Sequence, residues 1–247
     1  MSELAIIGGS GLDRLEGLEI TGAAPVSTPY GPTSAPVVRG RLAGAEVLFL
    51  ARHGSGHTIP PHRINYRANI RALADLGARE VVAVAAVGGI APALGPGAIA
   101  VPAQVIDYTW GREQTFWGEG AEVRHVDFTR PYAEPLRARL LAAAKAVGET
   151  VHDGGTYGAT QGPRLESAAE IDRMARDGCD LVGMTGMPEA ALARELGLAY
   201  ACCALVVNAA AGRGPAEITM AAIEANLVEG MARVRRILAR LAGGPGA

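Results

Sequence analysis

The chain has 247 residues, enough for one α/β domain with a sizeable core or for two small domains. Hydrophobic residues make up 49% and charged residues 19%, and 33 positions are glycine, a composition that excludes disorder and collagen-like repeats. Lys and Arg total 23 and Asp and Glu total 25, so the net charge of −2 gives no diffuse attraction to nucleic acid or anionic membranes. An anionic ligand would have to be held locally.

Cysteine usage and the apolar runs indicate the compartment. Cys179, Cys202 and Cys203 form neither a C-x-x-C pair nor an even-numbered set, which disfavours a disulfide framework and a zinc site. The apolar run at residues 4–7 is too short for the core of a signal peptide. Residues 81–106 are interrupted by glycines and prolines that a membrane-spanning helix would not carry. We therefore expect a cytoplasmic protein that does not contact a membrane.

The predicted elements alternate between strands and helices. Continuous apolar runs are typical of strands covered on both faces, and a period of three to four residues is typical of helices. In chain order we predict strands at 4–7 and 47–51, a helix at 64–76, strands at 81–86 and 99–106 with a proline break, a helix at 131–147, strands at 151–157 and 199–207, and a helix at 219–241. The pattern predicts an α/β fold, a single domain over 1–242 with a mixed central sheet flanked by helices, and a flexible tail at 243–247.

The first candidate functional segment is Gly8-Gly9-Ser10-Gly11, directly after the first predicted strand. Glycines let backbone N–H groups crowd around an anion, and the Ser10 hydroxyl can add a donor. Arg14 stands where a dinucleotide fingerprint needs Gly or Ala, and the Gly-Lys-Ser/Thr of a P-loop is missing. A plain strand-to-helix turn remains the alternative.

Residues 52–63 place two arginines and three histidines at the end of a predicted strand, where ligands gather in α/β proteins. Arg52 can hold an oxyanion through two parallel hydrogen bonds, and His53 and His57 can donate to the same group. Glycines and prolines argue against a helix that would place both imidazoles on one face, and no glutamate is adjacent. Oxyanion binding is therefore favoured over a metal site and over a structural loop.

Three later segments also lie where strands end or helices begin. Residues 85–90 either let a flat ligand and an anion approach the backbone closely or form a bulge or tight turn without a ligand. Glu166 and Glu189 each open a helical stretch, where a carboxylate could cap amides or accept from a ligand N–H. Asn208 either caps a turn or binds a base edge, because one amide both donates and accepts.

Taken in this order, the segments resemble the trimeric purine nucleoside phosphorylase family, specifically its branch acting on 5′-methylthio nucleosides. The resemblance covers essentially the whole chain. It implies a partly barrel-like sheet, no metal and no organic cofactor, and inorganic phosphate as the co-substrate that cleaves the N-glycosidic bond. It also implies small-molecule partners, no nucleic acid, and a homotrimer with its sites near subunit interfaces. The resemblance rests on Gly-Gly-Ser10-Gly-Leu, Arg52-His53-Gly with Tyr66-Arg-Ala-Asn-Ile, Gly162-Pro-Arg-Leu-Glu166 and Met184-Thr-Gly-Met-Pro-Glu189.

The resemblance also implies residue roles, with Ser10, His53 and Asn208 as the expected catalytic residues. His125, in a loop with three other aromatic residues, is similar in position to the residue that a neighbouring subunit lends to the site; an exposed loop histidine is the alternative. Met184 would lie against the ribose. The implied phosphate site is Ser10, Arg52, His53, the Ala86 backbone and Thr185, and the implied base pocket is Val87, Gly88, Leu165 and Glu166.

Two departures from the family pattern bear on the substrate. The adenine-releasing branch has two aspartates where this chain has Asn208 and Ala210, and Asn208 can donate to the O6 of a 6-oxopurine while accepting from N7–H. The inosine and guanosine branch has a histidine where this chain has Met220, with Ile223 one turn on, which predicts an apolar 5′ pocket; core packing is the alternative for both residues.

Together these departures predict S-methyl-5′-thioinosine as the substrate. Phosphorolysis of methylthioadenosine and a general activity on 6-oxopurine nucleosides are the alternatives within the same chemistry. A non-catalytic nucleotide-binding module that uses the Gly-Gly-Ser-Gly turn is the alternative from a different class.

Overall fold

A computed structural model describes residues 3–118, 124–214 and 218–244. Strands are most of its elements, with five α-helices and a 3-10 turn at Pro61–Arg63 (η1) in the described part. The strands are β1 Leu4–Gly8, β2 Glu19–Ala24, β3 Ser27–Thr28, β4 Gly31–Pro32, β5 Val37–Leu42, β6 Ala45–Ala51, β7 Glu80–Gly89, β8 Ile99–Val101, β9 Gln104–Asp107, β10 Val151–Asp153, β11 Thr156–Ala159, β12 Leu181–Gly183 and β13 Ala199–Ala209. The helices are α1 Tyr66–Asp75, α2 Glu134–Ala146, α3 Ala168–Arg176, α4 Gly186–Glu195 and α5 Met220–Gly243.

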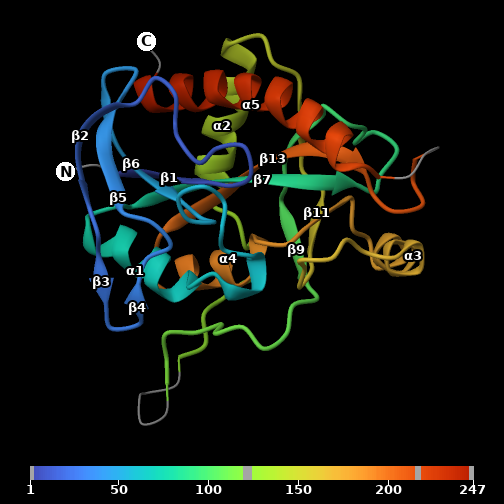
Figure 1. Cartoon of the computed structure of the whole chain (residues 1–247), viewed down its shortest axis with the longest axis horizontal. Helices are drawn as coiled ribbons and strands as arrows, with labels where there is room; N and C mark the ends of the chain where they lie inside the picture. Colours follow the sequence, from blue (N-terminus) through green and yellow to red (C-terminus); the bar gives the residue numbers. More distant parts are fainter. Residues whose placement is uncertain (1–2, 119–123, 215–217, 245–247) are drawn as a thin grey trace.

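A mixed sheet forms the centre of the fold, as the sequence predicted (Figure 1). Its main path runs β10-β8-β13-β7-β1-β6-β5-β2, and β1, β6, β7 and β13 lie parallel in the middle. These four strands are almost entirely buried because both faces are covered, which explains their unbroken apolar sequences. At the end of β7 the sheet branches, since β12 pairs antiparallel with Gly88 and Gly89 and leads on to β11 and β9.

The helices cover the sheet on both sides (Figure 1). Helix α5 packs on β13 and on α2, whereas α1 and α4 pack on each other across the opposite face. The inner stripe of α5 recurs every three or four residues, through Met231, Val234, Leu238 and Leu241, as the helical period demands. Thr219 caps this helix by accepting from the Ala222 N–H.

Some predicted boundaries were wrong. The strand expected at 151–157 is two strands, because Gly154 and Gly155 both have positive φ, 99° and 87°, which breaks the extended backbone. The last helix continues to Gly243, where the flexible tail was expected to begin, and residues 245–247 of that tail lie outside the described part. The edge strand β2 and its neighbour β5 were not predicted.

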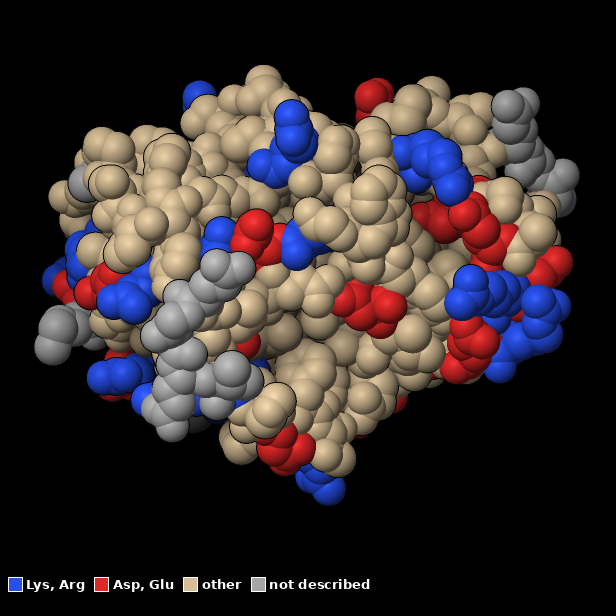
Figure 2. Space-filling view, turned by 90° about the horizontal axis from the view of Figure 1, so that it is seen from below, with Lys and Arg blue, Asp and Glu red and all other residues tan. Residues whose placement is uncertain are grey.

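Charged side chains of both signs are mixed on the face seen in Figure 2. They gather at the end of the molecule that carries α3, where Arg164 pairs with Glu170 and Arg213 with Asp172. No helix in the described ranges is both long enough and apolar enough to cross a membrane.

Candidate active site

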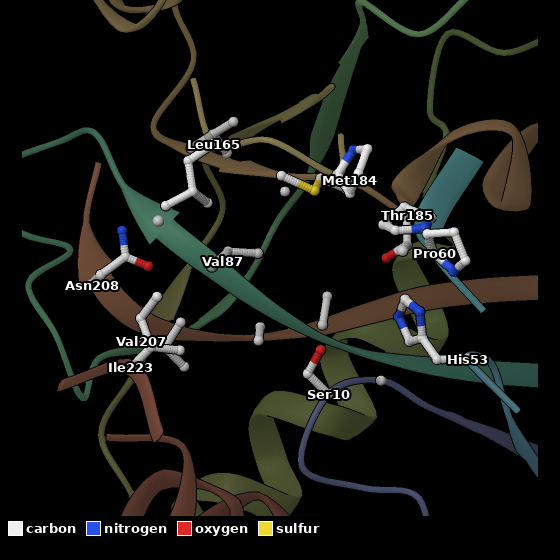
Figure 3. Close-up of a pocket in the computed structure, with 18 of the residues that line it drawn as sticks. Ser10, His53, Pro60, Val87, Leu165, Met184, Thr185, Val207, Asn208 and Ile223 are labelled. Carbon is white, nitrogen blue, oxygen red and sulfur yellow. The ribbon is translucent and has the colours of Figure 1, made fainter. Parts of the chain in front are cut away.

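A cavity of about 450 Å³ lies at the carboxyl ends of the parallel strands β1, β6, β7 and β13 (Figure 3). This is where ligands bind in open α/β sheets, because the loops that follow the strands meet there. Every residue that the sequence assigned to the site, apart from His125, lines this cavity. They are Ser10, Arg52, His53, Ala86, Val87, Gly88, Leu165, Glu166, Met184, Thr185, Asn208, Ala210, Met220 and Ile223.

The cavity has two polar ends joined by an apolar floor (Figure 3). Ser10, His53 and Thr185 lie at one end, and Asn208 lies at the other, near Leu165. The side chains between the two ends include Val87 and Met184. The arrangement can hold a ligand that is anionic or strongly polar at one end and flat, with a hydrogen-bonding edge, at the other.

Glycine in the first turn lets the chain pass close to β7 and to Arg52. A Cβ on Gly9 would lie 2.5 Å from the Val84 carbonyl oxygen and 3.0 Å from Arg52 Nη1. The next regular element after this turn is the strand β2, so the alternative of a strand-to-helix turn is wrong. Ser10 Oγ lies 3.4 Å from His57 Nε2 and lines the cavity.

The guanidinium of Arg52, which was expected to hold an oxyanion, binds a carboxylate of the protein itself. Its Nε and Nη2 donate to the two Glu189 oxygens at 2.8 Å each, and Nη1 donates to the Val84 carbonyl at 2.8 Å. The fork that was expected to hold an oxyanion is therefore occupied by a carboxylate. Tyr200 also donates to Glu189 at 2.8 Å. Burial alone lowers the pKa of Arg52, but the attraction and hydrogen bonds of Glu189 outweigh it and raise the pKa overall.

His53 is a neutral imidazole at physiological pH. Burial, followed by the Arg52 charge, lowers its pKa from 6.5 to about 4. Its Nδ1 lies 2.9 Å from the Ile59 carbonyl oxygen, which can only accept, so Nδ1 carries the proton. The remaining ring nitrogen is then an acceptor in the ligand-free protein, and the role of His53 in binding an oxyanion stays a prediction.

The alternative that this loop binds a metal ion would need further ligands beside His53 and His57. The His53 and His57 rings lie close together, with centroids 4.3 Å apart. In the part of the chain that the structure describes, no group of three His, Cys, Asp or Glu side chains is suited to hold a metal ion.

Asn208 reaches the other end of the cavity because β13 is irregular there. The register between β13 and β7 shifts between Val206 and Asn208, and such a bulge redirects the side chains that follow it. Asn208 Nδ2 donates to the Ala209 carbonyl at 2.7 Å. One N–H and the amide oxygen are left for a ligand, which suits an edge that both accepts and donates.

Neither glutamate caps a helix. The capping box of α3 is formed by Ser167 and Glu170, while Glu166 accepts from Thr160 Oγ1 at 2.6 Å. Glu189, on the first turn of α4, is fully buried against Arg52. From the sequence, Glu189 could be recognised only as a residue at the start of a helix. Its pairing with Arg52 could not be predicted, because no spacing rule links residues that lie 137 positions apart.

An apolar wall closes the cavity beside Asn208. Met220 and Ile223, from the start of α5, line it together with Val207 and with Ile218, which precedes the helix. Met220 is 65% exposed, so packing in the core does not explain it. His125 is also exposed and does not line the cavity of its own chain.

Comparisons with known proteins agree with this geometry. The family described as the phosphorylase superfamily matches residues 3–242. A "Probable S-methyl-5′-thioinosine phosphorylase" from Pseudomonas syringae pv. tomato is 58% identical over 242 residues, covering 98% of each chain. A "Probable 6-oxopurine nucleoside phosphorylase" from Dictyoglomus turgidum is 44% identical over 96% of this chain and 89% of its own. The solved structure of methylthioadenosine phosphorylase from Schistosoma mansoni in complex with adenine has a TM-score of 0.94 at 32% identity, over 98% of this chain and 91% of that one. The chain therefore belongs to the phosphorylase superfamily.

Proposed function

We propose that the chain catalyses the phosphorolysis of S-methyl-5′-thioinosine to hypoxanthine and 5-methylthioribose 1-phosphate, a reaction of purine salvage. The observation that carries this proposal is a cavity with a neutral amide at one end, hydroxyl donors at the other and an apolar wall beside the amide. The named activities of the relatives from Pseudomonas syringae and Dictyoglomus turgidum support the same chemistry.

The base end favours a 6-oxopurine. Asn208 can donate its free N–H to O6 and accept from N7–H at the same time. Because the hydrogen bond to the Ala209 carbonyl fixes the amide, the 6-amino group of adenine would instead meet the N–H, and a donor left without an acceptor under a bound base costs about 1–3 kcal/mol. Adenine is therefore the poorer leaving base in this cavity.

The apolar wall of the cavity favours an apolar 5′ group on the sugar. Ile218, Met220 and Ile223 offer a methylthio group contact surface but give a 5′-hydroxyl no hydrogen-bonding side chain. A difference of this kind in a hydrophobic pocket amounts to about 1–3 kcal/mol. Inosine is therefore expected to react, but more slowly than the methylthio nucleoside.

In the proposed reaction, an oxygen of hydrogen phosphate forms a bond to C1′ while the C1′–N9 bond breaks. The bonding pair leaves with the purine, and the proton of hydrogen phosphate is transferred to the released base, which leaves as neutral hypoxanthine. Ser10 and Thr185 hold the phosphate beneath the sugar, and Asn208 stabilises the electron density that arrives on the base. Arg52 contributes mainly through its fixed position, because Glu189 balances its charge. No metal or organic cofactor takes part.

We further propose a homotrimer with each site near a subunit interface. Leu165 and Met220 line the cavity yet are 44% and 65% exposed in a single chain, and a neighbouring subunit would cover them. His125, which does not reach its own cavity, would be the residue lent to the next one. Sedimentation equilibrium is expected to give the mass of three chains, and a monomer would contradict this arrangement.

A substrate comparison tests the proposed function. The protein is incubated with S-methyl-5′-thioinosine, methylthioadenosine and inosine, each with and without phosphate, and the released bases are separated chromatographically. We expect the highest kcat/KM for S-methyl-5′-thioinosine. Faster release of adenine would favour a methylthioadenosine phosphorylase, and equal rates with inosine would favour a general 6-oxopurine nucleoside phosphorylase.

A further inference from the structure

Arg112 lies outside the cavity, in the segment between β9 and α2, but its guanidinium reaches two loops that build the cavity. Its Nη2 donates to the carbonyls of Thr160 and Gln161 at 3.2 and 2.9 Å. Its Nη1 donates to the carbonyls of Met184 and Met187 at 2.9 and 2.6 Å. One planar side chain therefore connects the backbone after β11 with the backbone after β12.

Both loops carry residues of the cavity. The loop after β11 leads to Leu165 and Glu166, and the loop after β12 holds Met184 and Thr185. The Thr160 N–H donates to the Gly183 carbonyl at 2.8 Å, where the two strands end. Beyond that point the loops are in contact, since a Cβ on Gly162 would lie 2.4 Å from Met184 Sδ. Arg112 joins the carbonyls on either side of this contact.

The chemistry of these contacts calls for arginine. Its five N–H groups point outward in one plane, whereas a lysine offers three donors at a single point. The other partners of Arg112 are also neutral: Nε donates to Gln161 Oε1 at 3.1 Å, and Nη1 lies 3.2 Å from Tyr66 Oη. In the described part of the chain its hydrogen-bond partners include no carboxylate, so the residue orients backbone carbonyls and does not serve an ion pair.

We infer that Arg112 is a positioning residue for the reaction proposed above, on which this inference rests. It holds Thr185 and Met184 at a fixed distance from Leu165 and Glu166, so that phosphate, sugar and base meet in one alignment. A misplacement of about 1 Å can cost about 100-fold in rate even when the change lies away from the reacting atoms.

Arg137 provides a matched comparison. It is a buried arginine, whereas Arg112 is half-buried, and it too donates to two backbone carbonyls, those of Pro102 at 2.9 Å and Val101 at 3.0 Å. Unlike Arg112, it also pairs with the carboxylates of Glu134 at 2.6 Å and Asp153 at 2.5 Å. None of these residues lines the cavity. If an arginine that binds backbone carbonyls served stability alone, replacing Arg112 and replacing Arg137 would have the same consequences for catalysis.

The test compares the parent with Arg112→Ala, Arg112→Lys and Arg137→Ala in steady-state assays with S-methyl-5′-thioinosine and phosphate, alongside their melting temperatures. We expect Arg112→Ala to lower kcat/KM by about 10- to 100-fold with most of the loss in kcat, and millimolar guanidinium to restore part of it. Arg112→Lys should fall between this variant and the parent. Arg137→Ala should keep kcat and KM near the parent values, without a response to guanidinium.

The possible results of this test distinguish the role of Arg112 from the proposed function. Parent-like kcat and KM in Arg112→Ala, or the same kinetic losses in Arg137→Ala, would overturn the inference while leaving the proposed function intact. If Arg112→Ala does not fold, the intermediate kcat of Arg112→Lys carries the test, and a parent-like kcat there would overturn it. A parent without activity on any of the three nucleosides would refute the proposed function and the role of Arg112 with it.

Discussion

At the scale of single residues, the choice of base rests on the amide of Asn208. A carboxylate at this position would only accept, whereas the amide offers one N–H and one oxygen to the purine edge. The bulge in β13 brings this amide to the cavity. Position 210, which also lines the cavity, is alanine, so no acidic side chain competes with the amide for the base. Base preference is therefore a property of one hydrogen-bonding pattern, and it can be changed by one substitution.

Replacing Asn208 with Asp is expected to lower kcat/KM for S-methyl-5′-thioinosine by about 100-fold or more, because a donor to the developing charge is lost. The ratio of kcat/KM for methylthioadenosine to that for S-methyl-5′-thioinosine should rise. Asn226→Asp is the control, since Asn226 binds the Val207 carbonyl nearby but does not line the cavity. A ratio unchanged in Asn208→Asp would contradict the assignment of the base end.

The Arg52–Glu189 pair is a second residue-scale feature, and its energetics follow from burial. Arg52 is 1% exposed and Glu189 is 0% exposed, so neither charge has water to replace its partner. We expect Glu189→Gln to lower the free energy of unfolding by about 3–5 kcal/mol, as measured by urea denaturation.

The surface pair of Arg164 and Glu170 gives the control for this prediction. It likewise has two hydrogen bonds of 2.8 Å, here from Nη1 and Nη2, but its side chains are 71% and 45% exposed. Glu170→Gln should therefore cost only about 0–1 kcal/mol. Equal losses in the two variants would show that burial does not set the strength of the Arg52–Glu189 pair.

At the scale of elements, the start of α5 determines the 5′ pocket. Thr219 caps the helix, and the first turn then presents Met220 and Ile223 to the cavity while the later turns pack on β13 and α2. One helix therefore serves two purposes, with its exposed first turn available for substrate and its remaining length fixed in the core.

Replacing Met220 with His gives a 5′-hydroxyl a hydrogen-bonding partner and takes apolar contact from a methylthio group. The ratio of kcat/KM for inosine to that for S-methyl-5′-thioinosine should rise by about 10- to 200-fold, which corresponds to about 1–3 kcal/mol in a pocket of this kind. Val228→His is the control, because Val228 is also exposed on α5, at 73%, but does not line the cavity. A shift in both variants, or in neither, would contradict the 5′ assignment.

The elements also show how far sequence reasoning reaches. Strands buried on both faces were predicted because their apolar runs are unbroken, as in β7 and β13. The strand β2 was missed because it lies at the edge of the sheet, and β5, the strand next to it, was missed because it mixes buried with exposed positions. The position of the cavity could be predicted because it lies at the ends of strands, and the end of a strand can be recognised from the local sequence. The partners of Arg52 and Arg112 could not be predicted, because they come together only when distant segments fold.

At the scale of the whole molecule, stability is expected to depend on pH through His53. The unfolded imidazole takes up a proton near its ordinary pKa of 6.5, whereas burial and the Arg52 charge lower the pKa in the fold to about 4. Between these values the unfolded chain binds more protons than the folded one. The free energy of unfolding therefore falls as the pH is lowered from 6.5 towards 4.

His53→Asn should make this decline shallower, as measured by urea denaturation at several pH values in that range. His152→Asn, at an exposed position on β10, should leave the slope as it is in the parent protein. Parallel slopes for the parent and His53→Asn would show that His53 does not remain neutral in the fold.

The molecule as a whole carries almost no net charge and mixes both signs on the face in Figure 2, so phosphate must be bound by the local donors of the cavity. The most direct test follows both products from S-methyl-5′-thioinosine with and without phosphate. We predict equimolar hypoxanthine and 5-methylthioribose 1-phosphate with phosphate present and neither product without it. Hypoxanthine released together with free 5-methylthioribose in phosphate-free buffer would mean that water is the nucleophile, and would contradict the proposal.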